Sequence, residues 1–208
     1  MSVKRLIGLP GDTVELAGGE VWVDGKLLGK PPELDSELWH LVADSELRPK
    51  SPMAASPGWV VAPGSGWSAS GASFEHRGAT DAEERLELSG TIDDSFSYNS
   101  LYPPGGAPSP VGDVRVVATA TDIAAEGWLA VEWRRAGRIA RATLDAAGRT
   151  SLRLDDREVG SSPGTAPHGD VALGLVVRDG CVRVLRDGAA VVTSPLPGAE
   201  RLYREAER

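Results

Sequence analysis

Hydrophobic and polar residues alternate along much of the second half of this chain, with the period of two that places every other side chain on one face of a β-strand. Between positions 114 and 119, for instance, Val114, Val116 and Ala118 fall on the same face. The pattern predicts strands over 114–119, 127–133, 138–144, 150–154, 171–177, 182–185 and 189–192. The Gly/Ser/Pro-rich stretch 160–169 predicts a loop, and Asp155-Asp156 is expected to end the strand before it.

Short turn sequences separate these strands. The two-residue turns that join antiparallel neighbours are predicted at Ala136-Gly137, Asp179-Gly180 and Asp187-Gly188. Hairpins repeated at such short spacing are typical of an antiparallel sandwich or barrel. A chain of this length can bury a core between two such sheets, and Trp133 alternates in phase with apolar neighbours, which favours its burial. We therefore predict a mainly β fold with an antiparallel β-sandwich.

The first half of the chain alternates less regularly. The same criteria predict strands over 13–16, 20–23 and 26–28, with a hairpin turn at Asp24-Gly25. Gly29-Lys30-Pro31-Pro32 then stops regular structure. Further on, the pattern predicts a short helix over 33–41, strands over 59–61, 66–68 and 85–90, an extended run over 92–99, and a short amphipathic helix over 201–208.

Composition and charge argue against several classes of partner and structure. The 208 residues carry a net charge of −8, which argues against nucleic acid as a partner and against docking on an anionic membrane surface. No apolar run approaches the roughly 20 residues of a membrane-spanning helix. Cys181 is the single cysteine, so no internal disulfide can form, and we expect a half-buried, inert thiol.

No cofactor or metal ion is implied by the polar residues. The histidines at positions 40, 76 and 168 have no paired spacing for zinc. Asp93, Asp94 and Asn99 offer oxygen atoms for calcium, but they lack the close spacing of a recognised loop, which favours turn chemistry.

Candidate chemistry lies in the opening run from Val3 to Val14, a short strand that a Leu-Pro-Gly-Asp turn separates from the next strand. Lys4 shares a strand face with an aliphatic residue and with Gly8, which lets another backbone approach closely. On an apolar face, desolvation lowers the pKa of a lysine and makes it a candidate general base. Exposure on an edge strand is the alternative. In the turn, Pro10 fixes one dihedral, Gly11 tolerates positive φ, and Asp12 bonds backbone amides.

The run Lys-Arg-Leu-Ile-Gly-Leu-Pro-Gly-Asp resembles the lysine box of bacterial signal peptidase I, the serine–lysine protease that removes signal peptides at the outer face of the cytoplasmic membrane. The hairpin at 21–28 resembles the one that follows that box in the family. The resemblance implies that Lys4 is the general base, that Arg5 takes the structural position beside it, and that the substrate is the signal peptide of a pre-protein. The long middle portion is similar to a β-rich insertion of some members, and its hairpins resemble concanavalin-like or laminin-G-like jelly rolls.

Two family boxes are missing from this sequence. The serine box is expected well before the lysine, but Lys4 follows Met1 closely, and Ser51-Pro52-Met53 lies on the wrong side of Lys4 with the wrong spacing. The closing Gly-Asp-Asn box is missing too. A serine–lysine site needs both side chains within hydrogen-bond reach, so we expect this chain alone to be inactive.

A second hypothesis makes the sandwich a module that binds a glycan or a protein, with the lysine box as a vestigial appendage. Trp67, in a Gly/Ser context, is then the candidate for stacking on a ligand. In either case we expect a signal-peptidase-like segment over 1–34, a β-sandwich insertion over 35–197 and a return segment over 198–208.

Overall fold

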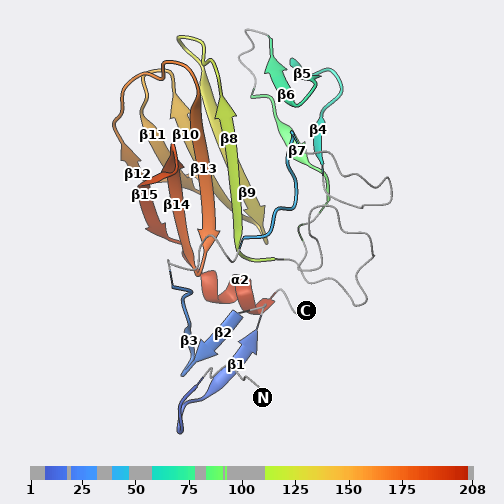
Figure 1. Cartoon of the computed structure of the whole chain (residues 1–208). Helices are drawn as coiled ribbons and strands as arrows, with labels where there is room; N and C mark the ends of the chain where they lie inside the picture. The colour runs from blue at the N-terminus through green and yellow to red at the C-terminus, as the bar shows by residue number, and fades with distance from the viewer. Residues whose placement is uncertain are drawn as a thin grey trace, which may run out of the picture. The chain divides into compact units, whose positions relative to one another are not determined.

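The structure is a computed structural model that describes residues 8–17, 20–31, 39–46, 58–77, 83–90, 92 and 111–205, with side chains described as far as Leu202 (Figure 1). The chain divides into two compact units. One comprises residues 1–32 together with 112–208, and the other comprises residues 33–111. The described residues are mainly β and antiparallel, which confirms the predicted fold class.

A small antiparallel sheet opens the first unit. It contains β1 (Val14–Ala17), β2 (Glu20–Val23) and β3 (Lys26–Leu27), in the order β1-β2-β3. Asp24 and Gly25 both have positive φ, 50° and 74°, as the predicted two-residue turn requires. One face of the sheet buries Ala17 and Trp22, against which Leu27 and Ala199 pack.

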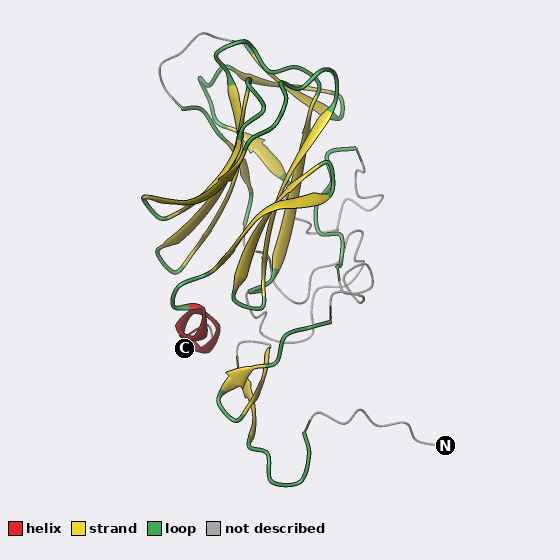
Figure 2. Cartoon of the chain, turned by 90° about the vertical axis from the view of Figure 1, so that its left-hand side faces the viewer, coloured by secondary structure: helices red, strands yellow, loops and turns green. Residues whose placement is uncertain are grey.

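The rest of this unit is a sandwich of two four-stranded sheets. One sheet has the order β12-β11-β10-β9 and the other the order β15-β14-β13-β8, and Figures 1 and 2 show them lying face to face. Their bounds are β8 Val114–Ala120, β9 Trp128–Arg135, β10 Arg138–Asp145, β11 Thr150–Leu154, β12 Arg157–Ser162, β13 Val171–Arg178, β14 Cys181–Arg186 and β15 Ala189–Pro195. The concanavalin-like assignment stays a prediction.

The core lies between the sheets and follows the predicted alternation. Ala140, Ala142 and Leu144 on β10 are fully buried, and their neighbours along the strand are not. Trp133 is buried, as its phase in the sequence predicted. Burial of this kind is worth roughly 1.5–3 kcal/mol for each large aliphatic side chain.

The strand β12 corrects the sequence-based prediction. Asp155-Asp156 was expected to end regular structure and 160–169 to be a loop, but Asp155 adopts φ 53° and turns the chain into β12, which pairs with β11 as far as Ser162. A register shift between Leu152 and Arg153 breaks the strict alternation here. An irregular register of this kind hides a strand from a period-of-two search.

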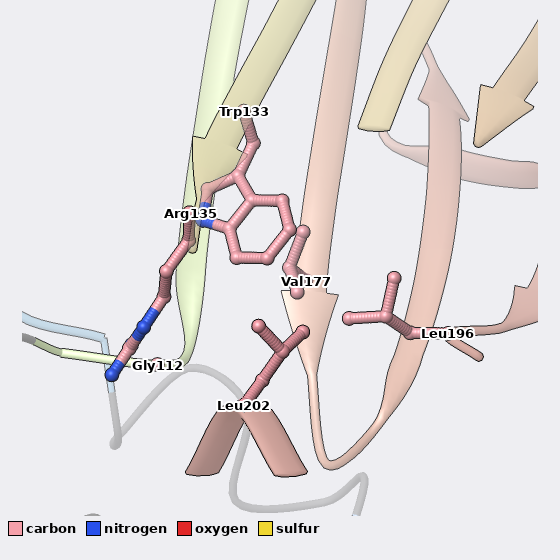
Figure 3. A pocket seen from close by; sticks show the side chains of 6 residues that line it. All are labelled: Gly112, Trp133, Arg135, Val177, Leu196 and Leu202. Carbon is pink, nitrogen blue, oxygen red and sulfur yellow. The ribbon is translucent and has the colours of Figure 1, made fainter. Parts of the chain in front are cut away.

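A short helix, α2 (Ala199–Glu205), closes one end of the sandwich and agrees with the predicted C-terminal helix. Leu202 points from α2 toward Trp133, Val177 and Leu196 (Figure 3). The cavity left among these side chains is only about 10 Å³, so the end of the core is well filled. The helix therefore contributes the Leu202 side chain to the hydrophobic core of the sandwich.

The second unit contains two short described ladders. In one, β4 (Trp59–Val61) pairs with β7 (Leu86–Leu88); in the other, β5 (Trp67–Ser70) pairs with β6 (Ser73–His76). Most of the helix predicted over 33–41 and nearly all of the extended run over 92–99 lie outside the described residues, and residues 39–41 are not helical. No helix among the described residues is both long and apolar enough to cross a membrane.

Candidate functional site

The turn that follows the lysine-bearing run is well defined. Asp12 accepts a hydrogen bond from the backbone N–H of Leu9 at 2.7 Å, and its own N–H donates to the carbonyl of Leu9 at 3.0 Å. Gly11 has a backbone φ of 101°, which residues other than glycine rarely adopt. Pro10 lies between these residues in the turn. Lys4 and Arg5, the two residues of the predicted site that carry chemistry, lie outside the described residues.

Gly8 packs directly against the first strand of the small sheet. A Cβ atom built on Gly8 would lie 2.6 Å from Val14 Cγ2, closer than non-bonded carbon atoms come. The turn therefore brings the end of the lysine-bearing run onto β1, and a glycine at position 8 is what permits this approach.

A poorly exposed cluster of charged side chains lies in the described part of the first unit, and the sequence did not indicate it. Lys30 Nζ donates hydrogen bonds to Glu20 Oε2 at 2.5 Å, to Asp113 Oδ2 at 2.8 Å and to Asp179 Oδ1 at 3.0 Å. The three carboxylate side chains are only 8–13% exposed. We refer to Glu20, Lys30, Asp113, Arg178 and Asp179 as the Lys30 cluster.

Arg178 supplies the second cation of the Lys30 cluster and is itself only 2% exposed. Its Nε donates to Asp179 Oδ2 at 3.0 Å, and its Nη2 donates to the carbonyl of Lys30 at 2.7 Å. The backbone N–H of Lys30 also donates to Asp179 Oδ2, at 3.0 Å. Both the side chain and the backbone of position 30 are thus fixed, at the point where the chain leaves the small sheet.

The Lys30 cluster joins segments that are distant in sequence. Glu20 lies on β2, Asp113 precedes β8, and Asp179 occupies the β13–β14 turn with φ 48°. The hydrogen bonds from Lys30 to Asp179 span 149 positions. The cluster therefore fastens the small sheet to the sandwich within the same unit.

The Lys30 amine stays protonated, and a protonated amine cannot act as a general base. Burial by itself lowers the pKa of Lys30, but hydrogen bonds to Asp113, Glu20 and Asp179 outweigh it and raise that pKa well above its usual range. Burial is also the main cause that raises the pKa of Glu20, helped by the negative charges of Asp113 and Asp179 and opposed by the bond to Lys30. Lys30 is therefore a permanent cation at neutral pH.

Oxygen atoms of Glu20, Asp113 and Asp179 lie within 4.8 Å of one another, a spacing that could suit a metal ion. Lys30 Nζ, however, hydrogen-bonds all three carboxylates and provides the positive charge there. A lysine ammonium and a metal ion compete for the same oxygen atoms. The arrangement is consequently suited to holding segments together rather than to metal chemistry.

Trp67, the predicted stacking residue, lies in the second unit and is half-buried. The centre of its ring lies 5.1 Å from the centre of the His76 ring, and the two ring planes are tilted by 59°. The Nε1 atom of Trp67 is buried without a hydrogen-bond partner among the described residues. His76 Nε2 in turn hydrogen-bonds Glu84 Oε2 at 2.8 Å. Trp67 therefore packs within its own hairpin. The calcium candidates Asp93, Asp94 and Asn99 lie outside the described residues.

Sequence reasoning missed the Lys30 cluster because each member has an ordinary local explanation. Asp179 is a turn residue, Lys30 precedes two prolines, and Glu20 looks like an exposed strand residue. The sequence offered one indication of the cluster. Arg178 ends an apolar strand, directly after Val177, and a charged side chain buried at such a position needs partners of opposite charge. The chemistry of the set depends on long-range contacts.

Comparison with known proteins bears on the first part of the chain. The family model described as "Signal peptidase, peptidase S26" matches residues 1–63, which include the lysine-bearing run, its turn and the small sheet. No curated protein and no solved structure matches the chain. The match supports, for residues 1–63, a relationship to the signal peptidase I family.

Proposed function

We propose that this chain is the lysine-bearing part of a signal-peptidase-I-type serine endopeptidase and that it is inactive on its own. The observation that carries the proposal is the family match over residues 1–63. The turn at Pro10–Asp12 and the tight contact of Gly8 with Val14 support it, because they give the segment after Lys4 a defined conformation.

In the proposed reaction, Lys4 acts as the general base, with Arg5 in the structural position beside it. A serine hydroxyl supplied by another segment attacks the scissile carbonyl, and its proton passes to the neutral amine of Lys4. The proton is then given to the leaving amide nitrogen, and water releases the acyl group from the serine. A base of this kind contributes roughly 10²–10⁴-fold to the rate.

Neither of the two lysines that the structure describes favours this role for itself. Lys30 is held as a cation by three carboxylates, and Lys26 is an exposed residue of β3. The substrate would be an extended signal-peptide segment that adds a strand to a sheet edge. The order β1-β2-β3 leaves the outer edge of β1 without a partner strand among the described residues, which supports that mode of binding.

The test compares the 208-residue chain with the longest reading frame that encodes it, using a fluorogenic signal-peptide reporter. The chain alone should not cleave the reporter, and a frame that also encodes a serine box should. In that longer protein, Lys4→Ala should lower kcat/KM at least about 100-fold. Lys26→Ala, a lysine change in the adjacent hairpin, is the matched control and should leave activity intact.

Two outcomes would overturn the proposal. One is cleavage by the 208-residue chain alone that disappears in the Lys4→Ala variant, since the nucleophile would then lie within this chain. The other is full activity of the Lys4→Ala variant in the longer protein, which would remove the general base from the mechanism.

A further inference from the structure

Four strands form the edges of the two sandwich sheets, and three of them carry features that hinder pairing with another chain. β12 and β15 contact each other, and a Cβ atom built on Gly160 would lie 2.8 Å from Val192 Cγ1. Each of these two strands also pairs with its neighbour through a register shift. β9 carries the charged residues Glu132, Arg134 and Arg135. Irregular register and charged side chains are common ways of protecting an edge strand.

The fourth edge, β8, lacks these features. Its seven residues contain neither proline nor glycine, and it pairs with β13 without a register shift. Arg115 is the one charged residue of the strand. Among the described residues, β8 has no partner strand on its outer side (Figure 1). A long, regular edge that is rich in β-branched residues is a template on which a further strand can pair.

The side chains of β8 are incompletely covered on both faces of the sheet. On the core side, Val116 and Ala118 are half-buried, although their partners on β13, Leu175 and Leu173, are at most 1% exposed. On the outer side, Val117 is 48% exposed. A strand added beside β8 would cover these apolar side chains, which is a second reason to expect a partner at this edge.

The sequence of β8 is complementary to itself in the antiparallel sense. Two β8 strands keep their cores on the same side only if residues of like phase face each other. The register centred on Val117 meets this condition and uses all seven residues: Val117 faces its own copy, Val116 faces Ala118, and Arg115 faces Thr119. The two Arg115 side chains are then four positions apart along the strands, about 13 Å, which exceeds the screening length of roughly 8 Å at physiological salt.

We propose that β8 pairs antiparallel with β8 of a second copy of this chain, about a two-fold axis at Val117, and so joins two sandwich sheets into one continuous sheet. This association is independent of the proposed peptidase function. Main-chain hydrogen bonds hold the two strands together, and the paired valine and alanine side chains add apolar contact. A second copy is favoured over a different protein because the two-fold register is met by the sequence of β8 alone.

The test is sedimentation equilibrium of the 208-residue chain from micromolar to millimolar concentration. The average mass should rise from the 21.8 kDa of one chain toward twice that value. Val117→Lys and Val117→Glu each place like charges at the two-fold axis and should weaken dimerisation at least about tenfold. A mixture of the two variants should restore the dimer, because lysine then faces glutamate. Val159→Lys, at an exposed valine of β12, is the matched control and should dimerise normally.

A cysteine pair tests the register itself. In a Cys181→Ser background, Val117→Cys should form an intermolecular disulfide under mild oxidation. Arg115→Cys should not, since it would lie about 13 Å along the strands from its own copy. The proposal is overturned if the chain stays monomeric at millimolar concentration, or if Val117→Lys and Val117→Glu both dimerise like Val159→Lys. It is also overturned if the disulfide forms equally at both positions.

Discussion

Lys30 Nζ lies 2.5 Å from Glu20 Oε2, and two further carboxylates, those of Asp113 and Asp179, bond the same ammonium. One lysine side chain thereby ties β2 to the start of β8 and to the β13–β14 turn. The small sheet that carries the family match and the sandwich are thus joined by polar contacts as well as by the packing of Leu27 and Ala199.

Replacement of Lys30 by methionine should destabilise the first unit strongly. The variant leaves three poorly exposed carboxylates without their shared ammonium, and breaking such a pair costs on the order of 3 kcal/mol. Lys30 is itself 31% exposed, so solvent lessens this cost. Urea unfolding followed by circular dichroism measures it. Lys26→Met, at an exposed position, should change the midpoint little, and equal effects of both variants would contradict the role of Lys30.

Glu20 should make stability depend on pH. Its pKa in the folded chain is raised, chiefly by burial, so the native state holds a proton that the unfolded chain releases near pH 4.5. The unfolding free energy should therefore fall as pH rises from about 4.5 through the raised pKa, and then level off.

Glu20→Gln removes this titration while keeping the side-chain size, so the fall with pH should flatten. Urea unfolding at a series of pH values between 4.5 and 8 measures the slope. Glu126→Gln, on an exposed turn, serves as the control and should leave the slope unchanged. An unchanged slope in Glu20→Gln would show that another group causes it.

Substitution of Gly8 by alanine should loosen the turn against β1. The added Cβ would lie 2.6 Å from Val14 Cγ2, and overpacking of this kind costs about 1–3 kcal/mol. Hydrogen exchange of the β1 and β2 amides should accelerate. Gly29→Ala, where nothing lies within 4 Å of the new methyl group, should have no such effect. Combining Gly8→Ala with Val14→Ala should restore protection if the clash is the cause.

Truncation of Leu202 to alanine should open the end of the sandwich. Leu202 is 8% exposed and fills the space beside Trp133 and Val177, so its loss should cost about 2–4 kcal/mol and lower Tm. Val117→Ala, at a position that is 48% exposed, is the control and should shift Tm much less. A Tm unchanged by Leu202→Ala would mean that α2 does not seal the core.

Strands and turns followed from local sequence because their determinants are local. The Asp-Gly pairs at 24–25, 179–180 and 187–188 all adopt positive φ at both residues, as the short turn demands. The alternation that predicted the burial of Trp133 reflects the pleat of a single strand. The resemblance of the opening run to signal peptidase I was likewise readable from contiguous residues, and the family model matches the same region.

The tertiary structure decided what distant residues do together. No local pattern could pair Lys30 with Asp113 or Asp179, because a charged residue at a turn has the same sequence signature whether water or a lysine satisfies it. The surroundings of the tryptophans were decided in the same way: Trp67 packs on His76, and Trp128 is 46% exposed with Arg141 over its ring. Local sequence determines the conformation of each strand, but which side chains meet, and which remain exposed, depends on how the sheets pack.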